Sequence, residues 1–262
     1  MDISVVIPVY NSSKILSELS NQLKNSLSKT SNKFEVIFVN DFSSDESWSK
    51  IVELSSQNKF IKGINLKKNY GQHNAIMAGL NHVSGSYIVL MDDDLQHSPN
   101  YVPKIVDELK KGYDVCYVKY LKRKHVLWKK FVSWLNNLTA SILANKPIRI
   151  YTSSFKGFNN KICKNMIVTK KNQIFLDWLI LDQTNNVSVI EVMHYERYSG
   201  ITNYNLGKLL ILWSTMVLNI KPKNKFSFIL LFFLKFFINI FSFIFVKKRD
   251  LQEQFSILEK TF

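Results

Sequence analysis

The chain has 262 residues, of which 46% are hydrophobic, so it can bury a substantial core and global disorder is excluded. Its 35 Lys and Arg residues against 20 Asp and Glu residues give a formal net charge of +15, which indicates an anionic partner such as a nucleic acid, a phosphorylated small molecule or an anionic membrane. Cys116 and Cys163 are the only cysteines and lie far apart, which argues against a disulfide framework and a cysteine-based metal site.

Up to about residue 120 the sequence alternates between predicted strands and predicted helices. Short β-branched runs predict strands at Ile3–Val9, Glu35–Val39, Ile61–Leu66, Tyr87–Met91 and Val115–Val118. Apolar residues with helical spacing lie between them, for example from Ile15 to Leu27 and from Val102 to Leu109. We therefore expect an α/β fold whose mostly parallel sheet is covered on both faces.

Polar residues follow three of these strands. Tyr10 and Asn11 come after the first, Asp41 after the second and the carboxylate run Asp92–Asp94 after the fourth. Because ligands of open parallel sheets bind beyond the C-terminal strand ends, we expect these side chains to share one edge of the sheet.

The carboxylate run predicts a cation site. Acidic residues in loops often only face water or cap a helix, but like charges at the end of a buried strand are costly unless something neutralises them. Side chains alternate along an extended chain, so Asp92 and Asp94 are expected to face the same way. Two converging carboxylates suit a hard divalent cation, Mg²⁺ or Mn²⁺, which would in turn hold a diphosphate.

The middle of the chain is strongly basic. Residues 119–130, KYLKRKHVLWKK, contain six cations and no carboxylate. Phe131–Leu143 is expected to form an amphipathic helix, and residues 149–200 mix strand-like and loop-like pieces in no clear order.

Beyond residue 205 the composition changes. Apolar spacing between Leu209 and Ile220 predicts an amphipathic helix at a membrane surface. The apolar segment 226–246 follows. It is long enough to span the core of a bilayer as a helix, which takes about 20 residues. Its few polar residues, with Lys235 near the middle, form a stripe along one side of a helix. We expect firm membrane attachment, through either a spanning helix or an in-plane or hairpin arrangement.

Five blocks carry a family resemblance in their order along the chain: VVIPVYN at 5–11, EVIFVNDFSSDES at 35–47, NYGQHNAIMAGLNHVSGSYIVLMDDDLQHSP at 69–99, SSFKGF at 153–158 and RYSGITNY at 197–204. Together they resemble the family 2 inverting glycosyltransferases, in particular the polyprenyl-phosphate branch typified by dolichol-phosphate mannose synthase. The likeness covers about residues 3–205, and its length makes the 69–99 block the most specific. It implies a GT-A fold that binds a nucleotide-sugar donor.

The resemblance also implies roles for single residues. The residues that it assigns to the donor site are Pro8, Tyr10, Asn11, Asp41, Asn69, Gly71, Asp92 and Asp93. Asp41 is expected to bind the base, although a turn-forming role is the alternative. Asp92, Asp94 and Gln96 are expected to hold the metal ion on the donor diphosphate. Asp93 stands where the family often has alanine, so we expect it to tolerate substitution.

The acceptor implied by this branch is a polyprenyl phosphate, which is already an anionic nucleophile at neutral pH and needs no general base. It needs cations instead. By position, Lys119 and Lys129 match family arginines that bind the acceptor phosphate, and Arg197 matches another recurrent arginine of the family. With Asp94 these three residues form the predicted catalytic set. A generic basic surface facing anionic lipid is the alternative for any single lysine. Lysine is also a point charge that cannot form the bidentate contacts of arginine.

Two other functions remain open at this level. A transferase of the same fold acting on a glycan hydroxyl would need a base, for which Asp177 is a candidate, although a structural role is more usual for such a residue. A nucleic-acid-binding module is suggested by the charge alone, but no motif supports it, so no nucleic-acid partner is expected.

The resulting map places a catalytic domain at 1–205, a juxtamembrane helix at 206–225, a membrane-embedded helix at 226–246 and a basic, amphipathic tail at 247–262. The N-terminus has no cationic or apolar leader, so we expect the catalytic domain on the cytoplasmic face of the membrane. Departures from the family pattern, such as Phe42 for glycine and Ser12 for glutamate, leave the sugar and the base open. A homo-oligomer is also left open.

Overall fold

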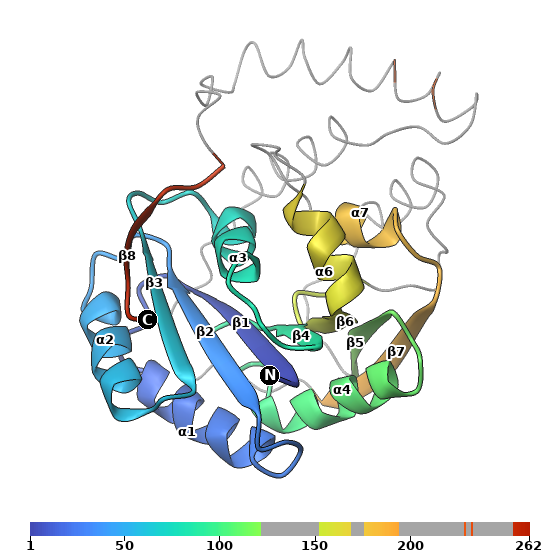
Figure 1. The fold of residues 1–262 in the computed structure, drawn as a ribbon, viewed down its shortest axis with the longest axis horizontal. Coiled ribbons are helices and arrows are strands. Elements are labelled where there is room, and N and C mark those ends of the chain that lie inside the picture. Colours follow the sequence, from blue (N-terminus) through green and yellow to red (C-terminus); the bar gives the residue numbers. More distant parts are fainter. Residues whose placement is uncertain (122–151, 169–175, 194–227, 229–231, 233–253) are drawn as a thin grey trace.

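The computed structural model describes residues 1–121, 152–168, 176–193, 228, 232 and 254–262 (Figure 1). These residues form an eight-stranded sheet with the strand order β7-β5-β6-β4-β1-β2-β3-β8. The strands are β1 (Ile3–Val9), β2 (Phe34–Asn40), β3 (Ile61–Leu66), β4 (Tyr87–Leu90), β5 (Val115–Leu121), β6 (Lys156–Asn159), β7 (Val187–Met193) and β8 (Ile257–Lys260).

The sheet is mostly parallel, as predicted. The central strands β4, β1, β2 and β3 are parallel neighbours, and β5 is parallel to β7. Two strands run the other way: β6 lies between β4 and β5 and is antiparallel to both, and β8 is antiparallel to β3. The C-terminal ends of β1 to β5 and β7 therefore lie along the same edge of the sheet.

Helices cover both faces of the sheet (Figure 1). They are α1 (Leu16–Leu27), α2 (Ser47–Gln57), α3 (Gln72–Leu80), α4 (Val102–Lys110), α6 (Asn160–Ile167) and α7 (Leu176–Leu181). One core lies between the sheet and α1, α2 and α4, and a second lies between the sheet and α3, α6 and α7. Because side chains alternate along a strand, β1 directs Val5 into the first core and Val6 into the second.

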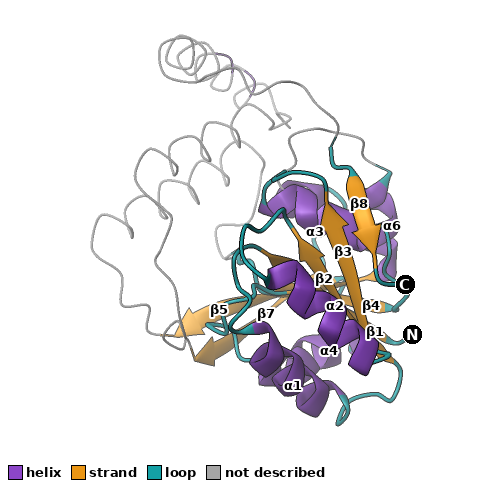
Figure 2. Ribbon diagram, turned by 90° about the vertical axis from the view of Figure 1, so that its left-hand side faces the viewer, coloured by secondary structure: helices purple, strands orange, loops and turns teal. Residues whose placement is uncertain are grey.

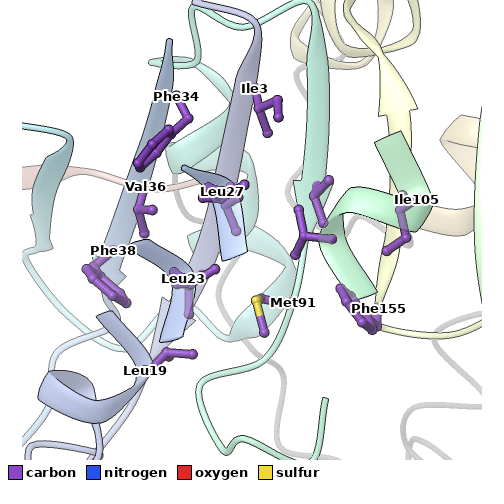
Figure 3. Close-up of a cluster of buried hydrophobic side chains, with 14 of the residues drawn as sticks. Ile3, Leu19, Leu23, Leu27, Phe34, Val36, Phe38, Met91, Ile105 and Phe155 are labelled. Atoms are coloured by element: carbon purple, nitrogen blue, oxygen red, sulfur yellow. The ribbon is translucent and has the colours of Figure 1, made fainter. Parts of the chain in front are cut away.

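The first core shows how the apolar spacing of α1 builds the fold. Leu19, Leu23 and Leu27 lie on one side of this helix and face Phe34 and Phe38 of β2 (Figure 3). All three leucines are fully buried, and each burial stabilises the fold by about 1.5–3 kcal/mol. The helical spacing in the sequence thus predicted the buried face correctly.

The predicted strands match closely, with two differences. Ile3–Val9 and Ile61–Leu66 have the predicted bounds, but β4 ends at Leu90, so Asp92 lies beyond the strand and Asp93 and Asp94 lie in a bend. The expectation that strand alternation makes Asp92 and Asp94 face the same way therefore does not apply. In addition, the segment 247–262 was assigned to a tail outside the catalytic domain, whereas its residues Ile257–Lys260 form β8 within the sheet.

Several predictions concern residues outside the described part. These are the helix Phe131–Leu143, the juxtamembrane helix 206–225 and all of 226–246 except Phe228 and Phe232. Within the part of the chain that the structure describes, no helix has both the length and the apolar character needed to cross a membrane.

Candidate active site at the C-terminal edge of the sheet

The turns after β1, β2 and β4 meet at the C-terminal edge of the sheet, as the sequence predicted. The backbone N–H of Tyr10 donates to Oδ2 of Asp93 over 3.3 Å, and Oδ1 of Asn11 accepts from the backbone N–H of Ser44 over 2.8 Å. Pro8 lies just before this edge, buried in β1. The pairing of β1 with β4 stops at Val6, so the N–H that proline lacks leaves no hydrogen bond to β4 unmade.

Asp41 holds the loop that leads into α3. Its Oδ1 accepts from the backbone N–H of Tyr70 at 2.7 Å and its Oδ2 from that of Gly71 at 2.9 Å, while Nδ2 of Asn69 donates to its carbonyl oxygen. The side chain is buried, and burial raises its pKa against the lowering effect of the two backbone donors. Asp41 therefore holds a loop that is distant in sequence, which differs from the local turn-forming alternative, and its contact with a base stays a prediction.

Gly71 has φ +87°, a conformation that residues with a Cβ rarely adopt. This glycine turns the chain so that consecutive N–H groups reach Asp41 and α3 begins directly afterwards. Asn69 and Gly71 thus shape the loop that leads into α3, and their contact with the donor stays a prediction.

Asp92 is fixed by residues from two distant parts of the chain. Its Oδ1 accepts from Nε2 of Gln72 in α3 at 2.7 Å, and its Oδ2 accepts from Oγ of Ser154 at 2.7 Å. Nδ1 of His97 lies 3.9 Å from the same Oδ2. The carboxylate is half-buried, so one side of it remains accessible from the edge.

His97 is itself fixed between two aromatic rings. It stacks on Tyr120 of β5 and on Phe155, with ring centroids 5.3 Å apart in both cases and interplanar angles of 10° and 7°. The imidazole is 6% exposed, so its position next to Asp92 is set by packing. Phe155 follows Ser154, which means that one short segment orients Asp92 both directly and through His97.

Asp93 and Asp94 have hydrogen-bond partners different from those of Asp92. Burial, reinforced by the charges of Asp92 and Asp94, raises the pKa of Asp93 to about 6, against the lowering effect of hydrogen bonds from Ser12 and the Tyr10 backbone. Oδ1 of Asp94 accepts from the backbone N–H of Gln96 at 3.1 Å, which forms a tight turn. We expected Asp93 to tolerate substitution, but its carboxylate joins the turn after β4 to the end of β1.

Backbone strain gathers at the same edge. The described residues include three non-glycine residues with positive φ: Asn11 (54°), Phe42 (60°) and Leu95 (54°). Each lies in a turn that follows β1, β2 or β4. Strained conformations of this kind persist where the surrounding structure enforces them, and they concentrate at functional sites. Phe42 also exposes 54% of its surface, which leaves its ring accessible beside Asp41.

The donor atoms at this edge fit a hard divalent cation. Carboxylate oxygens suit Mg²⁺ or Mn²⁺, and Asp92, Asp94 and Gln96 lie in one short segment. Among residues 1–121, 152–168, 176–193 and 254–262, no three His, Cys, Asp or Glu side chains are grouped closely enough to hold a metal ion. A cation there would need further oxygens from a ligand or from water, which is usual for Mg²⁺.

The predicted acceptor residues are only partly visible. Lys119 is near the end of β5, and its ammonium forms a 2.6 Å ion pair with Glu191 of β7. Both side chains are about half exposed, so this pair is weak and Lys119 can exchange it for another anion at little cost. Lys129 and Arg197 lie outside the described residues.

Asp177, in α7, belongs to a buried polar cluster with side chains of β5 and β6. Its Oδ1 accepts from the ammonium of Lys156 and from the hydroxyl of Tyr117, the latter at 2.9 Å. Asp177 is 8% exposed and Lys156 is 3% exposed. A buried carboxylate with a cationic partner ties α7 to the sheet and is poorly placed to accept a proton from an acceptor.

Sequence reasoning missed Gln72, His97 and Ser154 as residues that bear on Asp92. All three lie inside blocks that carry the family resemblance, 69–99 and 153–158. That placement was the available signal, but only the fold shows that the two blocks meet.

Comparisons with known proteins agree with this geometry. The sequence model described as "Glycosyl transferase family 2" matches residues 4–167, which extend from β1 through β6 and include Asp41, Asp92 and Ser154. Among curated proteins, the undecaprenyl-phosphate 4-deoxy-4-formamido-L-arabinose transferases of Serratia proteamaculans and Salmonella choleraesuis are 31% and 32% identical over 216 residues. The alignments cover 82% of this chain and 66% of the relatives, so the chain spans just under two thirds of their length.

Solved structures show the same fold. Glucosyl-3-phosphoglycerate synthase from Mycobacterium tuberculosis, crystallised with Mn²⁺, uridine diphosphate and glucosyl-3-phosphoglycerate, superposes with a TM-score of 0.63 at 15% sequence identity. The superposition covers 86% of this chain and 81% of that one. The expected GT-A-like α/β fold is thereby confirmed.

Proposed function

The chain belongs to glycosyl transferase family 2, and on that basis we propose that it transfers a sugar from a nucleotide-sugar donor to a polyprenyl phosphate, with inversion at the anomeric carbon. The observation that carries the proposal is the joining of three strand ends into one oxygen-rich edge, where Asp41 and Asp92 are each fixed by hydrogen bonds. The names of the curated relatives support undecaprenyl phosphate as the acceptor.

Asp92 and Asp94 would hold a divalent cation, and Gln96 would assist them. When bound, the cation stabilises the negative charge that develops on the leaving diphosphate. The Mn²⁺ and uridine diphosphate in the structural relative support a donor of this kind. Ser154, Gln72 and His97 orient Asp92 so that its position is set before the donor binds.

The loop at Asn69–Gly71 and the turns containing Tyr10 and Phe42 surround the place where the nucleoside would lie. Asp41 keeps this loop in position, and the exposed rings of Tyr10 and Phe42 offer faces for a base. The strain at Phe42 is consistent with an enforced position at a binding site.

The acceptor phosphate attacks the anomeric carbon with an oxygen that is already anionic at neutral pH, while the bond from that carbon to the donor diphosphate breaks. No proton has to be removed from such an acceptor, so the transfer does not require a general base. Lys119, together with Lys129 and Arg197 by sequence, would reduce the repulsion between two anionic substrates.

A glycan hydroxyl is the second candidate acceptor. It requires a base within hydrogen-bonding reach, and Asp177 is the candidate for that base. Its ion pair with Lys156 and its burial disfavour that role. The polyprenyl phosphate is therefore the better acceptor.

The apolar segment 226–246 would bring the enzyme to the bilayer where the acceptor resides, with the catalytic domain on the cytoplasmic face. A direct assay tests the function. The full chain in membranes is incubated with Mn²⁺, radiolabelled nucleotide-sugars and undecaprenyl phosphate, and the lipid is extracted with solvent. We expect metal-dependent label in the organic phase; label found only on water-soluble glycan, or transfer to undecaprenol lacking the phosphate, would contradict the proposal.

A further inference from the structure

The connection between β7 and β8 leaves one outermost strand of the sheet and returns to the other. Both points lie at the edge formed by the C-terminal ends of the parallel strands. β7 ends at Met193 and is parallel to β5, so it ends at the C-terminal edge that carries the candidate site. β8 begins at Ile257, which pairs with Leu66 at the end of β3, and it therefore starts at this edge too. β7 and β8 are the two outermost strands of the sheet (Figure 1). At about 4.8 Å between neighbouring strands, these points lie roughly 30 Å apart across the sheet.

β8 is firmly part of the catalytic sheet (Figure 2). The backbone N–H of Lys67 donates to the carbonyl of Ser256 at 3.0 Å, and that of Thr261 donates to the carbonyl of Gly63 at 3.1 Å. A side-chain bond adds to the ladder, since Oγ1 of Thr261 accepts from the N–H of Gly63 at 2.8 Å. Ile257 also packs against the core beneath α3.

Side chains from α2 reinforce this docking. Nε1 of Trp48 donates to Oε2 of Glu259 at 2.9 Å. A Cβ on Gly63 would lie 3.0 Å from Thr261 and 3.1 Å from Trp48, so β3 carries glycine where α2 and β8 come closest. The C-terminal segment is thus held by backbone, side-chain and packing contacts together.

Residues 194–256 connect β7 to β8, and they contain the apolar stretch 226–246. We propose that this connection enters and leaves the membrane on the side that holds the catalytic domain, and that it directs the candidate-site edge of the sheet toward the bilayer. The proposal rests on the membrane attachment in the proposed function and goes beyond it, because it excludes a single membrane crossing.

The reason is one of chain continuity. A single crossing at 226–246 would carry β8 to the opposite side of the membrane, away from β3. That would break the ladder described above and leave the edge of β3 unpaired. It would also move Lys247, Lys248 and Arg249 through the bilayer, although each charge costs about 2.5–3.5 kcal/mol at its centre.

The basic stretch gives a second reason for the orientation. β5 ends at Leu121 at the candidate-site edge, and β6 starts at Lys156 opposite Leu90, at the same edge. The residues that follow Leu121 include the cations from Lys122 to Lys130. Both the most basic and the most apolar connections of the chain therefore depart from and return to one edge, as expected if that edge faces anionic lipid.

Cysteine labelling tests the topology without relying on turnover. Leu258→Cys places a thiol on β8, where the side chain is 60% exposed, and Val52→Cys places one on α2, where it is 39% exposed. Native Cys116 and Cys163 are buried and give little background. With a membrane-impermeant maleimide and sealed vesicles of either orientation, both sites should label from the same side; labelling from opposite sides would overturn the proposal, as would recovery of the full chain in the soluble fraction.

A depth measurement tests the orientation. A fluorophore on Lys68→Cys, just past the end of β3, should be quenched by lipids carrying a nitroxide on the acyl chain. One on Lys33→Cys, just before β2 at the opposite edge, should not be quenched. Equal or reversed quenching would overturn the orientation. If the labelling succeeds and no sugar reaches the lipid, only the proposed function fails; if sugar transfer proceeds with opposite-side labelling, only this inference fails.

Discussion

The hydroxyl of Ser154 donates a 2.7 Å hydrogen bond to Oδ2 of Asp92, and it thereby joins two segments that are 62 residues apart. We expect Ser154→Ala to lower kcat/KM by roughly ten- to a hundredfold, because one hydrogen bond to a charged group contributes about 1.5–3 kcal/mol. Ser154→Thr keeps the hydroxyl and is the matched control. The lipid-linked sugar assay, repeated over a Mn²⁺ titration, measures both variants, and equal activity of wild type and Ser154→Ala would contradict the role.

Asp94 is predicted to be essential for metal-dependent transfer. Asp94→Asn removes a charge at the predicted cation site and should reduce transfer by about a hundredfold or more. It should also abolish the rise in Tm that Mn²⁺ and a nucleoside diphosphate produce together. Asp107→Asn, at an exposed position of α4, is the control and should behave like wild type. A Mn²⁺-dependent rise in Tm that survives Asp94→Asn would place the cation elsewhere.

Asp41 is predicted to act on stability and donor binding together. In Asp41→Asn, one of the two backbone N–H donors, from Tyr70 or Gly71, faces an amide N–H in place of an oxygen. We expect a loss of about 1–3 kcal/mol in the free energy of unfolding and a higher KM for the donor. Urea unfolding and initial rates measure these two quantities. An unchanged stability would show that the loop is held by other contacts.

Glu35, which lies away from the candidate site, should make the stability of the fold depend on pH. Burial alone would raise its pKa, but hydrogen bonds from Lys62, Ser4 and Ser84 outweigh burial and hold the pKa below the ordinary 4.5. Because the folded-state pKa is the lower one, the carboxylate stabilises the fold above about pH 4.5, and this contribution is lost as the pH falls through the folded-state pKa.

Glu35→Gln should therefore cost about 2–3 kcal/mol at pH 7. Its difference from wild type should shrink as the pH falls below about 4.5 and through the folded-state pKa of Glu35, because protonated Glu35 is neutral, as glutamine is at every pH. Urea unfolding between pH 7 and pH 3.5 gives the comparison. Glu53→Gln, which removes an exposed carboxylate of α2, should have little effect at any pH. A gap that is constant with pH would mean that the charge of Glu35 does not matter.

Asp177→Asn separates a structural role from a catalytic one. It leaves the ammonium of Lys156 buried without its counter-ion, which should cost about 3–5 kcal/mol of stability. The double variant Asp177→Leu with Lys156→Met should recover part of that loss, as judged by Tm. A base would give the opposite pattern, with Asp177→Asn keeping its Tm and losing turnover.

Local sequence pattern predicted the parts of the fold that local physics determines. Helix α1 buries one face, which the spacing of its leucines shows in the sequence. Strand β1 is buried on both faces, which its continuous β-branched run shows. The shared edge followed from the parallel arrangement, which brought Asp41, Asp92 and Asn11 together as expected.

The remaining features depend on partners far away in the chain. β6 is four residues long and exists because β4 and β5 flank it, and β8 pairs with a strand almost 200 residues earlier. The same applies to Ser154 and His97, whose importance follows from the segment they contact. No pattern within a short window encodes such pairings, so the sequence alone predicts a tail at 247–262.

β8 also protects the edge of β3 from pairing with a second copy of the protein. A bare β3 would present a row of unsatisfied N–H and C=O groups in an apolar sheet, which is a template for strand addition by another molecule. Fragments that stop before residue 254 should therefore aggregate or form spurious edge-to-edge dimers, even if every residue around Asp92 is intact.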